Sequence, residues 1–180
     1  MGVRSVGPGT GAALRFVAAA LDSRAVVEIG TGTGVSGLWL LRGMRPDGVL
    51  TTVDIEAEHQ RQARLGFTDA GVPAQRARTI AGAALEVLPR LTDSHYDLVL
   101  CDADPHESDA YLDEALRLLR PGGVVILVDA LAGGRVPDPA QRDTLTTTLR
   151  DLGQRVREDE RLLPLLLPVG DGLLCARLQP

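Results

Sequence analysis

The 180-residue sequence contains no lysine and no asparagine, so all 19 of its basic residues are arginines. A mechanism that needs a lysine base or an asparagine ligand from this chain is therefore excluded. No uninterrupted apolar run reaches the roughly 18 residues that a membrane-spanning helix needs. The N-terminal segment also lacks the long apolar stretch and cleavage site of a secretion signal. Together these absences predict a cytoplasmic protein with no membrane partner.

Cysteine and positive charge are also scarce. The two cysteines, Cys101 and Cys175, lie in apolar, strand-like runs and are expected to be small buried residues, which suits a reducing compartment. The net charge of −5 argues against nucleic acid as the main partner. A chain of this length fits one domain, over residues 1–180, with a sizeable core.

Strand-like and helix-like segments alternate along the chain. Expected helices occupy residues 9–21, 35–44, 56–70, 83–90, 107–119 and 139–152, and expected strands occupy 25–29, 49–53, 77–80, 98–101, 124–128, 161–168 and 172–178. This alternation predicts an α/β fold, a doubly wound and mostly parallel seven-stranded sheet with helices on both faces. The last two strands are too close in sequence for a crossover, so the final strand is expected to be antiparallel. A ligand would then bind at the carboxyl ends of the parallel strands.

The most specific segment is the strand at 25–29 with the glycine-rich turn that follows it. Gly30, Gly32 and Gly34 allow a ligand to approach the backbone closely, because they have no Cβ atom. The helix behind them offers unpaired N–H groups to a carboxylate or phosphate. Asp54 ends the next strand and is placed to accept both hydroxyls of a ribose. The glycine-rich turn and Asp54 together predict a nucleoside-bearing cofactor.

A second reading of the same glycines is open. Gly32, Gly34 and Gly37 form the literal G-x-G-x-x-G pattern of nicotinamide and flavin enzymes. In that pattern the first glycine should follow the strand immediately, and here that glycine is Gly30. A dehydrogenase would also need a substrate domain, for which 180 residues leave little room.

Several candidate site residues have plainer structural interpretations. Asp54 could be a solvated strand end, Ser36 an ordinary first-turn residue of a helix, and Asp102 or Asp104 the cap of the helix near residue 107. The remaining expectations are that Asp97 enters a strand, that Trp39 belongs to the core, and that His59 and His95 lie on the surface.

Six stretches resemble, in order over nearly the whole chain, the S-adenosylmethionine-dependent methyltransferases. They are residues 27–36, 52–56, 85–89, 96–104, 118–123 and 168–172. Within that group the chain is most similar to the small O-methyltransferase family of catechol and caffeoyl-CoA O-methyltransferases, and to its actinobacterial branch. The resemblance implies methyl transfer from S-adenosylmethionine to a hydroxyl oxygen of a small molecule, and a homodimer.

The resemblance also implies roles for individual residues. Gly30, Thr31 and Ser36 would hold the amino-acid end of the cofactor, with Gly32 and Gly34 in the same loop. Asp54 would bind the ribose and Ile55 would flank the adenine. The other implied cofactor residues are Glu28, which would fix the loop, Val6 and Ala83 through their backbones, and Asp102 and Asp104 beyond the fourth strand.

The metal site of the family is only partly present. Metal-dependent members place Asp and Lys three residues apart after the fourth strand, and an Asp-Asn pair after the fifth. Here Asp102 is followed by Pro105 in the lysine position, and Asp129 is followed by Ala130 in the asparagine position. Asp102 and Asp129 could still hold Mg²⁺, with Asp104 adding a third oxygen, so metal dependence stays open.

Methyl transfer from a sulfonium asks mainly that an oxygen be positioned in line with the methyl group. Asp102 would contact the substrate, and Asp102, Asp104 or His106 would act as the base. Only 24 residues precede the first strand, so the N-terminal helices that cover the acceptor in relatives are short or missing here. Two other functions remain open: a cofactor-binding protein whose catalysis is lost or metal-independent, and a nicotinamide-dependent oxidoreductase.

Overall fold

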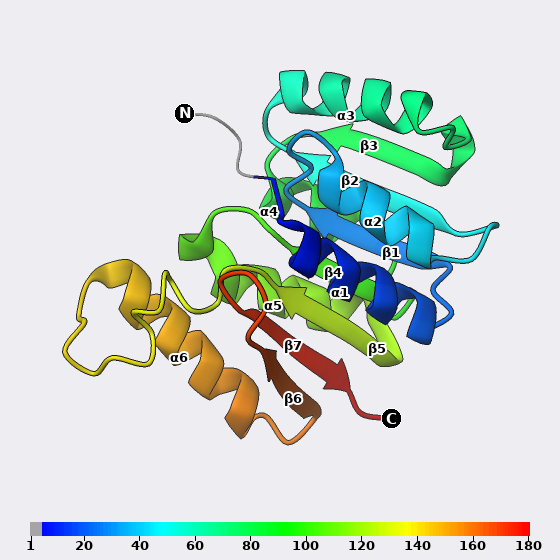
Figure 1. The fold of residues 1–180 in the computed structure, drawn as a ribbon. Coiled ribbons are helices and arrows are strands. Elements are labelled where there is room, and N and C mark those ends of the chain that lie inside the picture. Colours follow the sequence, from blue (N-terminus) through cyan, green and yellow to red (C-terminus); the bar gives the residue numbers. More distant parts are fainter. Residues whose placement is uncertain (1–4) are drawn as a thin grey trace.

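The computed structural model describes residues 5–180. Seven strands form one sheet in the order β3-β2-β1-β4-β5-β7-β6 (Figure 1). The strands are β1 Ala25–Ile29, β2 Val49–Asp54, β3 Ala77–Ala81, β4 Tyr96–Cys101, β5 Leu119–Leu127, β6 Leu162–Leu167 and β7 Leu173–Leu178.

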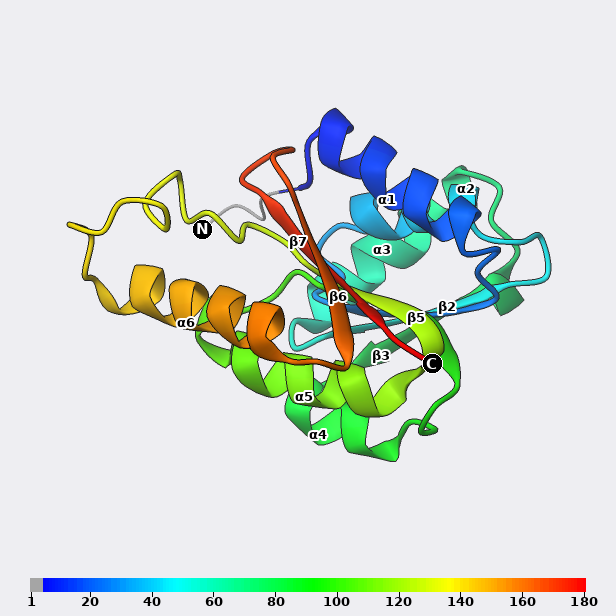
Figure 2. The ribbon, with the colours of Figure 1, turned by 90° about the horizontal axis from the view of Figure 1, so that it is seen from below.

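Helices cover both faces of this sheet. Seen from below in Figure 2, α1, α2 and α3 lie on one face, and α4, α5 and α6 lie on the other. The α-helices are α1 Pro8–Ala20, α2 Val35–Gly43, α3 Ala57–Asp69, α4 Ala84–Val87, α5 Ser108–Leu118 and α6 Thr144–Glu158. Short 3-10 turns are η1 Ala74–Arg76, η2 Leu88–Arg90 and η3 Pro105–Glu107.

The strand pairings confirm the predicted fold class. β1 pairs in parallel with β2 and with β4, so the strand order reverses there and opens a crevice at the carboxyl ends. β7 runs antiparallel to both β5 and β6, as the short connection at Gly170–Gly172 requires.

Two elements differ clearly from the sequence-based expectation. The strand expected at 124–128 is longer in the structure, where β5 begins at Leu119, directly after α5, and its register against β4 shifts between Tyr96 and Leu98. The expected helix at 139–152 begins instead at Thr144, because the Asp143 carboxylate caps it by accepting from Thr146 N at 3.1 Å. The proline at 139 therefore belongs to the turns before the helix.

The apolar core has two parts, one on each face of the sheet. Leu14, Leu40 and Phe67 belong to the part under α1, α2 and α3, and Leu112 and Leu152 belong to the part under α5 and α6. Both cysteines are buried free thiols. Trp39 is half-buried, and the space opposite its indole is kept open by a glycine of α1. Among the described residues, no helix is long and apolar enough to cross a membrane.

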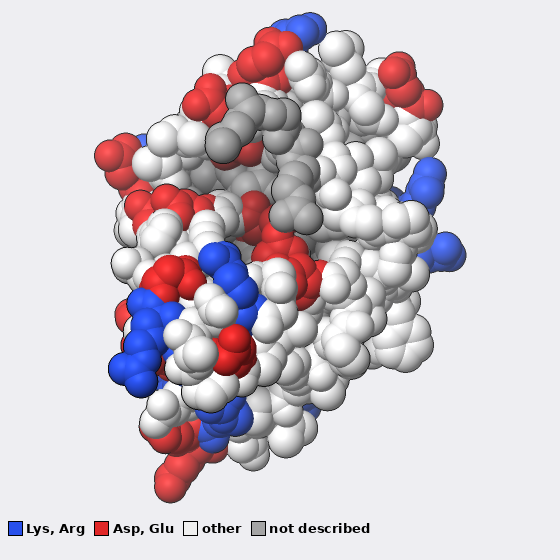
Figure 3. All heavy atoms as spheres, turned by 60° about the vertical axis from the view of Figure 1, so that its left-hand side comes forward, with Lys and Arg blue, Asp and Glu red and all other residues white. Residues whose placement is uncertain are grey.

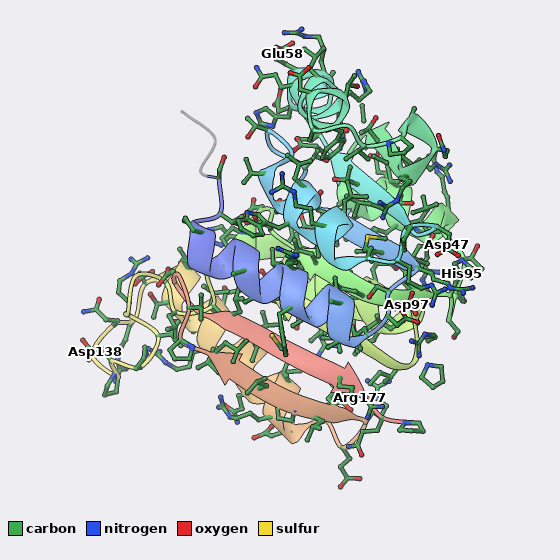
Figure 4. The ribbon with its side chains drawn as sticks, turned by 45° about the vertical axis from the view of Figure 1, so that its right-hand side comes forward. Asp47, Glu58, His95, Asp97, Asp138 and Arg177 are labelled. Carbon is green, nitrogen blue, oxygen red and sulfur yellow. The ribbon has the colours of Figure 1, made fainter. Side chains whose placement is uncertain are left out.

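Asp97 ties the amino ends of the strands together, far from their carboxyl ends (Figure 4). Its carboxylate accepts from Arg24 N at 2.6 Å, Ala25 N at 2.8 Å and Arg120 Nε at 2.6 Å. Burial alone would raise the pKa of Asp97, but these hydrogen bonds hold it below its ordinary value. The strand-entry interpretation of Asp97 is therefore correct, and His95 beside it is exposed as expected.

We expect Asp97→Ala to destabilise the fold without weakening ligand binding at the carboxyl ends of the strands. Two backbone N–H groups would lose their acceptor, and we expect a cost of about 3 kcal/mol in the free energy of unfolding. Urea denaturation of the wild type and the variant measures this difference. A change below about 1 kcal/mol, the size of one ordinary hydrogen bond, would contradict this role.

Candidate functional site

A cavity of about 560 Å³ lies over the glycine loop at the carboxyl ends of β1, β2 and β4. Its wall contains ten of the predicted cofactor residues, which the fold brings together from five separate segments. They are Val6, Gly30, Thr31, Gly32, Ser36, Asp54, Ile55, Ala83, Asp102 and Asp104.

Two glycines of the loop are required by their surroundings. Gly30 has a φ of 93°, and a Cβ atom there would lie 2.0 Å from the carbonyl oxygen of Asp102. Gly34 has a φ of 87° and precedes α2, where a Cβ atom would press on Ala63 of α3 at 3.0 Å. Gly30 thus packs against the segment after β4, and Gly34 packs the loop onto α3 rather than lining the cavity.

Asp54 holds the loop in place from the end of β2. Its Oδ2 accepts from Gly32 N at 2.9 Å, and its Oδ1 accepts from Glu56 N at 2.9 Å. His59 Nδ1 lies 3.2 Å from Oδ1, and His59 lines the cavity. The expectation that His59 is merely a surface residue was wrong, because the first turn of α3 carries it back over Asp54.

Thr31 contributes its backbone, not its hydroxyl, to the cavity. The side chain points into the core, where Thr31 Oγ1 lies 2.6 Å from Thr52 Oγ1 and accepts from Gln60 Nε2 at 2.8 Å. Only 1% of Thr31 is exposed. The hydroxyl is therefore committed to holding the loop on β2 and α3.

Glu28 lies beneath the loop and is completely buried. Its Oε2 accepts from Thr52 Oγ1 at 2.6 Å. Burial raises the pKa of Glu28 to about 7, while the hydroxyls of Ser36 and Thr52 act in the opposite direction. Glu28 does not line the cavity, and its hydrogen bond goes to Thr52 of β2 beneath the loop, so a role in fixing the loop stays a prediction.

A second cavity, of about 740 Å³, adjoins the first through Ser5, Val6 and Asp102, which line both. Figure 3 looks onto this edge of the molecule, where acidic side chains gather in a hollow with arginines at its lower rim. The wall of the second cavity contains both polar and apolar residues. The polar ones include Thr10, Asp102, Asp129, Arg135 and Asp171, and the apolar ones include Pro105, Val128, Ala132, Leu145 and Leu149.

Asp102 lines both cavities. Burial, followed by repulsion from Asp129, raises the pKa of Asp102 to about 6. Asp129 itself has a φ of 55°, which is a strained conformation for a residue with a side chain. Backbone hydrogen bonds from Ala130 N to Gly172 O at 3.1 Å and from Leu131 N to Asp171 O at 2.9 Å hold this segment in place.

The residues present fit a divalent metal poorly. Asp102 and Asp129 meet at the second cavity, but Asp104 caps η3 by accepting from His106 N at 2.9 Å. Within residues 5–180 no group of three His, Cys, Asp or Glu side chains is placed to hold a metal ion.

The plainer interpretation of Asp104, as a cap, is thus part of its role, although it also lines the first cavity. His106 is exposed and lines neither cavity, so the structure gives no geometry for it as a base. Sequence reasoning did not single out several lining residues, namely Glu107 and Tyr111 in the first cavity and Thr10, Arg135 and Asp171 in the second. They follow no motif, and only tertiary packing brings them there.

Comparison with known proteins agrees with this geometry. The family model described as O-methyltransferase matches residues 3–178. A curated relative from Mycolicibacterium smegmatis is 53% identical over 176 residues, which are 98% of this chain and 84% of the relative.

Solved structures agree as well. The O-methyltransferase from Bacillus cereus, in complex with SAH, is 28% identical with a TM-score of 0.89, covering 97% of this chain and 83% of that one. An O-methyltransferase of tomaymycin synthesis from Streptomyces achromogenes, in complex with SAM, is 30% identical with a TM-score of 0.89, covering 98% of this chain and 82% of that one. Since the family model spans almost all of its length, this chain belongs to the O-methyltransferase family.

Proposed function

We propose that this protein binds S-adenosylmethionine (SAM) in the first cavity and transfers its methyl group to a hydroxyl oxygen of a small molecule in the second. The observation that carries the proposal is that two cavities meet at Asp102. A cofactor on the glycine loop and an acceptor beyond Asp102 would then share one boundary, where methyl transfer takes place. The neighbours with bound SAM or SAH (S-adenosylhomocysteine) support this choice of cofactor.

The cofactor would be held at both ends by groups already described. The N-terminal end of α2, with Ser36, favours the carboxylate of the amino-acid end. Asp54 accepts the ribose hydroxyls, because each carboxylate oxygen can accept further hydrogen bonds beyond those from the loop. Ile55 is 69% exposed beside Asp54, and offers an apolar surface to the adenine.

The chain's own contribution to methyl transfer is orientation of the acceptor and removal of its proton. Asp102 would accept the hydroxyl proton, since it lines both cavities and burial makes its carboxylate a stronger base than that of an exposed aspartate. The apolar wall formed by Val128, Leu145 and Leu149 suits a flat hydrocarbon body. Arg135, the basic residue among the described lining residues, would meet a polar or acidic substituent.

Calorimetric titration tests this proposal, with SAH and NADH as the two ligands. We expect SAH to bind saturably and NADH not to bind, and a panel of phenolic acceptors to show turnover with SAM. Asp102→Asn should retain SAH binding and lose turnover by about a hundredfold or more, the usual worth of a positioned base. Tighter binding of NADH would restore the oxidoreductase alternative, and SAH binding without any turnover would favour a protein that has lost catalysis.

Two further expectations from the sequence stay predictions. A homodimer and a cytoplasmic location both follow from the family resemblance and composition, and sedimentation of the purified protein would measure the first directly.

A further inference from the structure

The chain between β5 and α6 forms one wall of the second cavity. Residues 128–143 contain turns but no helix or strand, and they extend beyond the sheet (yellow in Figure 1). Asp129 and Ala132 have positive φ angles although they carry side chains, and such a conformation persists only where surrounding contacts hold it. We call residues 128–143 the acceptor loop, because Asp129, Ala132 and Gly133 line the cavity.

Arg150 of α6 holds the far half of the acceptor loop. Its Nε donates to Val136 O at 3.1 Å, and its Nη2 donates to Asp138 O at 3.0 Å and to Gln141 O at 3.1 Å. A guanidinium is planar and its N–H groups have fixed directions, so three carbonyls bound to it are fixed relative to one another and to α6. The preceding residue, Leu149, lines the cavity. One helical turn therefore joins the loop to the apolar wall.

Asp171 holds the near half of the loop, and Arg135 lies between the two attachments. Asp171 Oδ2 accepts from Gly133 N at 2.6 Å. Arg135 Nε donates to Ala132 O at 2.8 Å, and Arg135 Nη1 lies 3.6 Å from Asp143 Oδ2. The other N–H groups of the Arg135 guanidinium form no hydrogen bond with the described residues. Since Arg135 lines the second cavity, these groups can donate to a ligand there.

The charged groups of the second cavity differ in their distance from the cofactor. Asp102 lines both cavities, whereas Arg135 lines only the second. The other two carboxyl groups in the wall belong to Asp129, which follows β5, and Asp171, which accepts from Gly133 N. An acceptor whose hydroxyl lies at Asp102 would therefore extend away from the cofactor toward Arg135. A carboxylate suits that end, because a guanidinium binds it through two parallel hydrogen bonds.

We propose that Arg150 is a positioning residue for the methyl acceptor. By holding the carbonyls of Val136, Asp138 and Gln141, it keeps Arg135 directed at the second cavity, and Arg135 then selects acceptors that carry a carboxylate. This inference rests on the proposed function, because it takes the second cavity as the acceptor site.

Binding of two phenols to the SAH complex tests the selection. Protocatechuate is a catechol that carries a carboxylate, and catechol itself is the neutral comparison. By calorimetry, we expect the wild type saturated with SAH to bind protocatechuate about tenfold more tightly than catechol, the lower end for a hydrogen bond to a charged group. Arg135→Met keeps the aliphatic stem of the side chain and should bind the two phenols equally.

Arg150→Met should lose the same preference, although Arg150 does not line the cavity. We expect its affinity for protocatechuate to fall about tenfold, and its affinities for SAH and catechol to stay within about twofold of the wild type. The double variant Arg135→Met, Arg150→Met should be no weaker than Arg135→Met, because both changes remove the same contact. Arg150→Lys keeps the charge but cannot bind three carbonyls in the same geometry. It should also lose most of the preference, which provides a second variant should Arg150→Met fold poorly.

Arg155→Met is the matched control on the same helix. Arg155 pairs with Asp109 and Asp113 of α5 and not with the acceptor loop. This variant should keep the full preference for protocatechuate.

Amide hydrogen exchange shows whether the loop itself has been released. Val136 N donates to Leu131 O at 3.1 Å, and in Arg150→Met we expect it to exchange faster while the amides of β4 are unchanged. Unchanged exchange at Val136, a preference for protocatechuate that survives in Arg150→Met, or no preference in the wild type would each overturn the role of Arg150 while leaving SAH binding intact. Failure of the wild type to bind SAH at all would instead overturn the proposed function.

Discussion

Replacing Gly30 by alanine is expected to weaken cofactor binding strongly and to destabilise the fold. The added Cβ atom would lie 2.0 Å from the carbonyl oxygen of Asp102, which is backbone and cannot rotate away. The φ of 93° also disfavours any side chain. The glycine loop and the segment after β4 would have to separate. A displacement of about 1 Å at such a site lowers its activity about a hundredfold.

We therefore expect Gly30→Ala to weaken SAH binding by about a hundredfold or more, measured by calorimetry. The free energy of unfolding should fall by about 3 kcal/mol, the sum of backbone strain and overpacking. Gly71→Ala is the matched control: its φ of 74° is also positive, but a Cβ atom there would meet nothing within 4 Å. In that variant the free energy of unfolding should fall by only about 1 kcal/mol, from backbone strain, and SAH binding should be normal. Equal losses in both variants would mean that contact with Asp102 is unimportant.

Replacing Asp54 by alanine is expected to have the second largest effect. The variant loses the acceptor for the ribose hydroxyls and also the hydrogen bonds that hold Gly32 N and Glu56 N. Hydrogen bonds to a charged group contribute about 1.5–3 kcal/mol each, so loss of one or two to the ribose weakens binding by about a hundredfold or more.

Asp47→Ala provides the control for the change in charge. Asp47 is also an aspartate, but it lies in the turn before β2, at the amino ends of the strands, where it pairs with Arg45 (Figure 4). SAH affinity should be unchanged in this variant. Calorimetry measures the SAH affinity of both variants. If Asp54→Ala binds SAH as tightly as the wild type does, Asp54 is not part of the cofactor site.

Motifs of the sequence predicted much of this site because they are local. A strand that ends in glycines, followed by a helix, forms an anion-binding turn in almost any context, so Gly30, Gly32 and Ser36 could be placed without a structure. The acidic end of the next strand must lie beside that turn, because parallel neighbours align their carboxyl ends. Asp54 could therefore be assigned from its position at the end of the next strand.

Side-chain direction was not predictable in the same way. Thr31 lines the cavity as expected from its position, but its hydroxyl points into the core, which no motif indicated, and His59, expected on the surface, faces the cavity. Whether a loop side chain points up or down depends on Thr52 and Gln60, which come from other elements. Sequence spacing carries no information on such contacts.

The sequence by itself determined the fold class, the antiparallel last strand and the residues of the glycine loop, since each depends on local periodicity, a short connection or glycine. The tertiary structure alone decided that Glu28 lies without an opposite charge, that Asp102 lines both cavities, and that Asp104 caps η3. These properties depend on burial and on distances between segments far apart in the chain. The electrostatic energy of a carboxyl group is set by those distances and not by its neighbours in sequence.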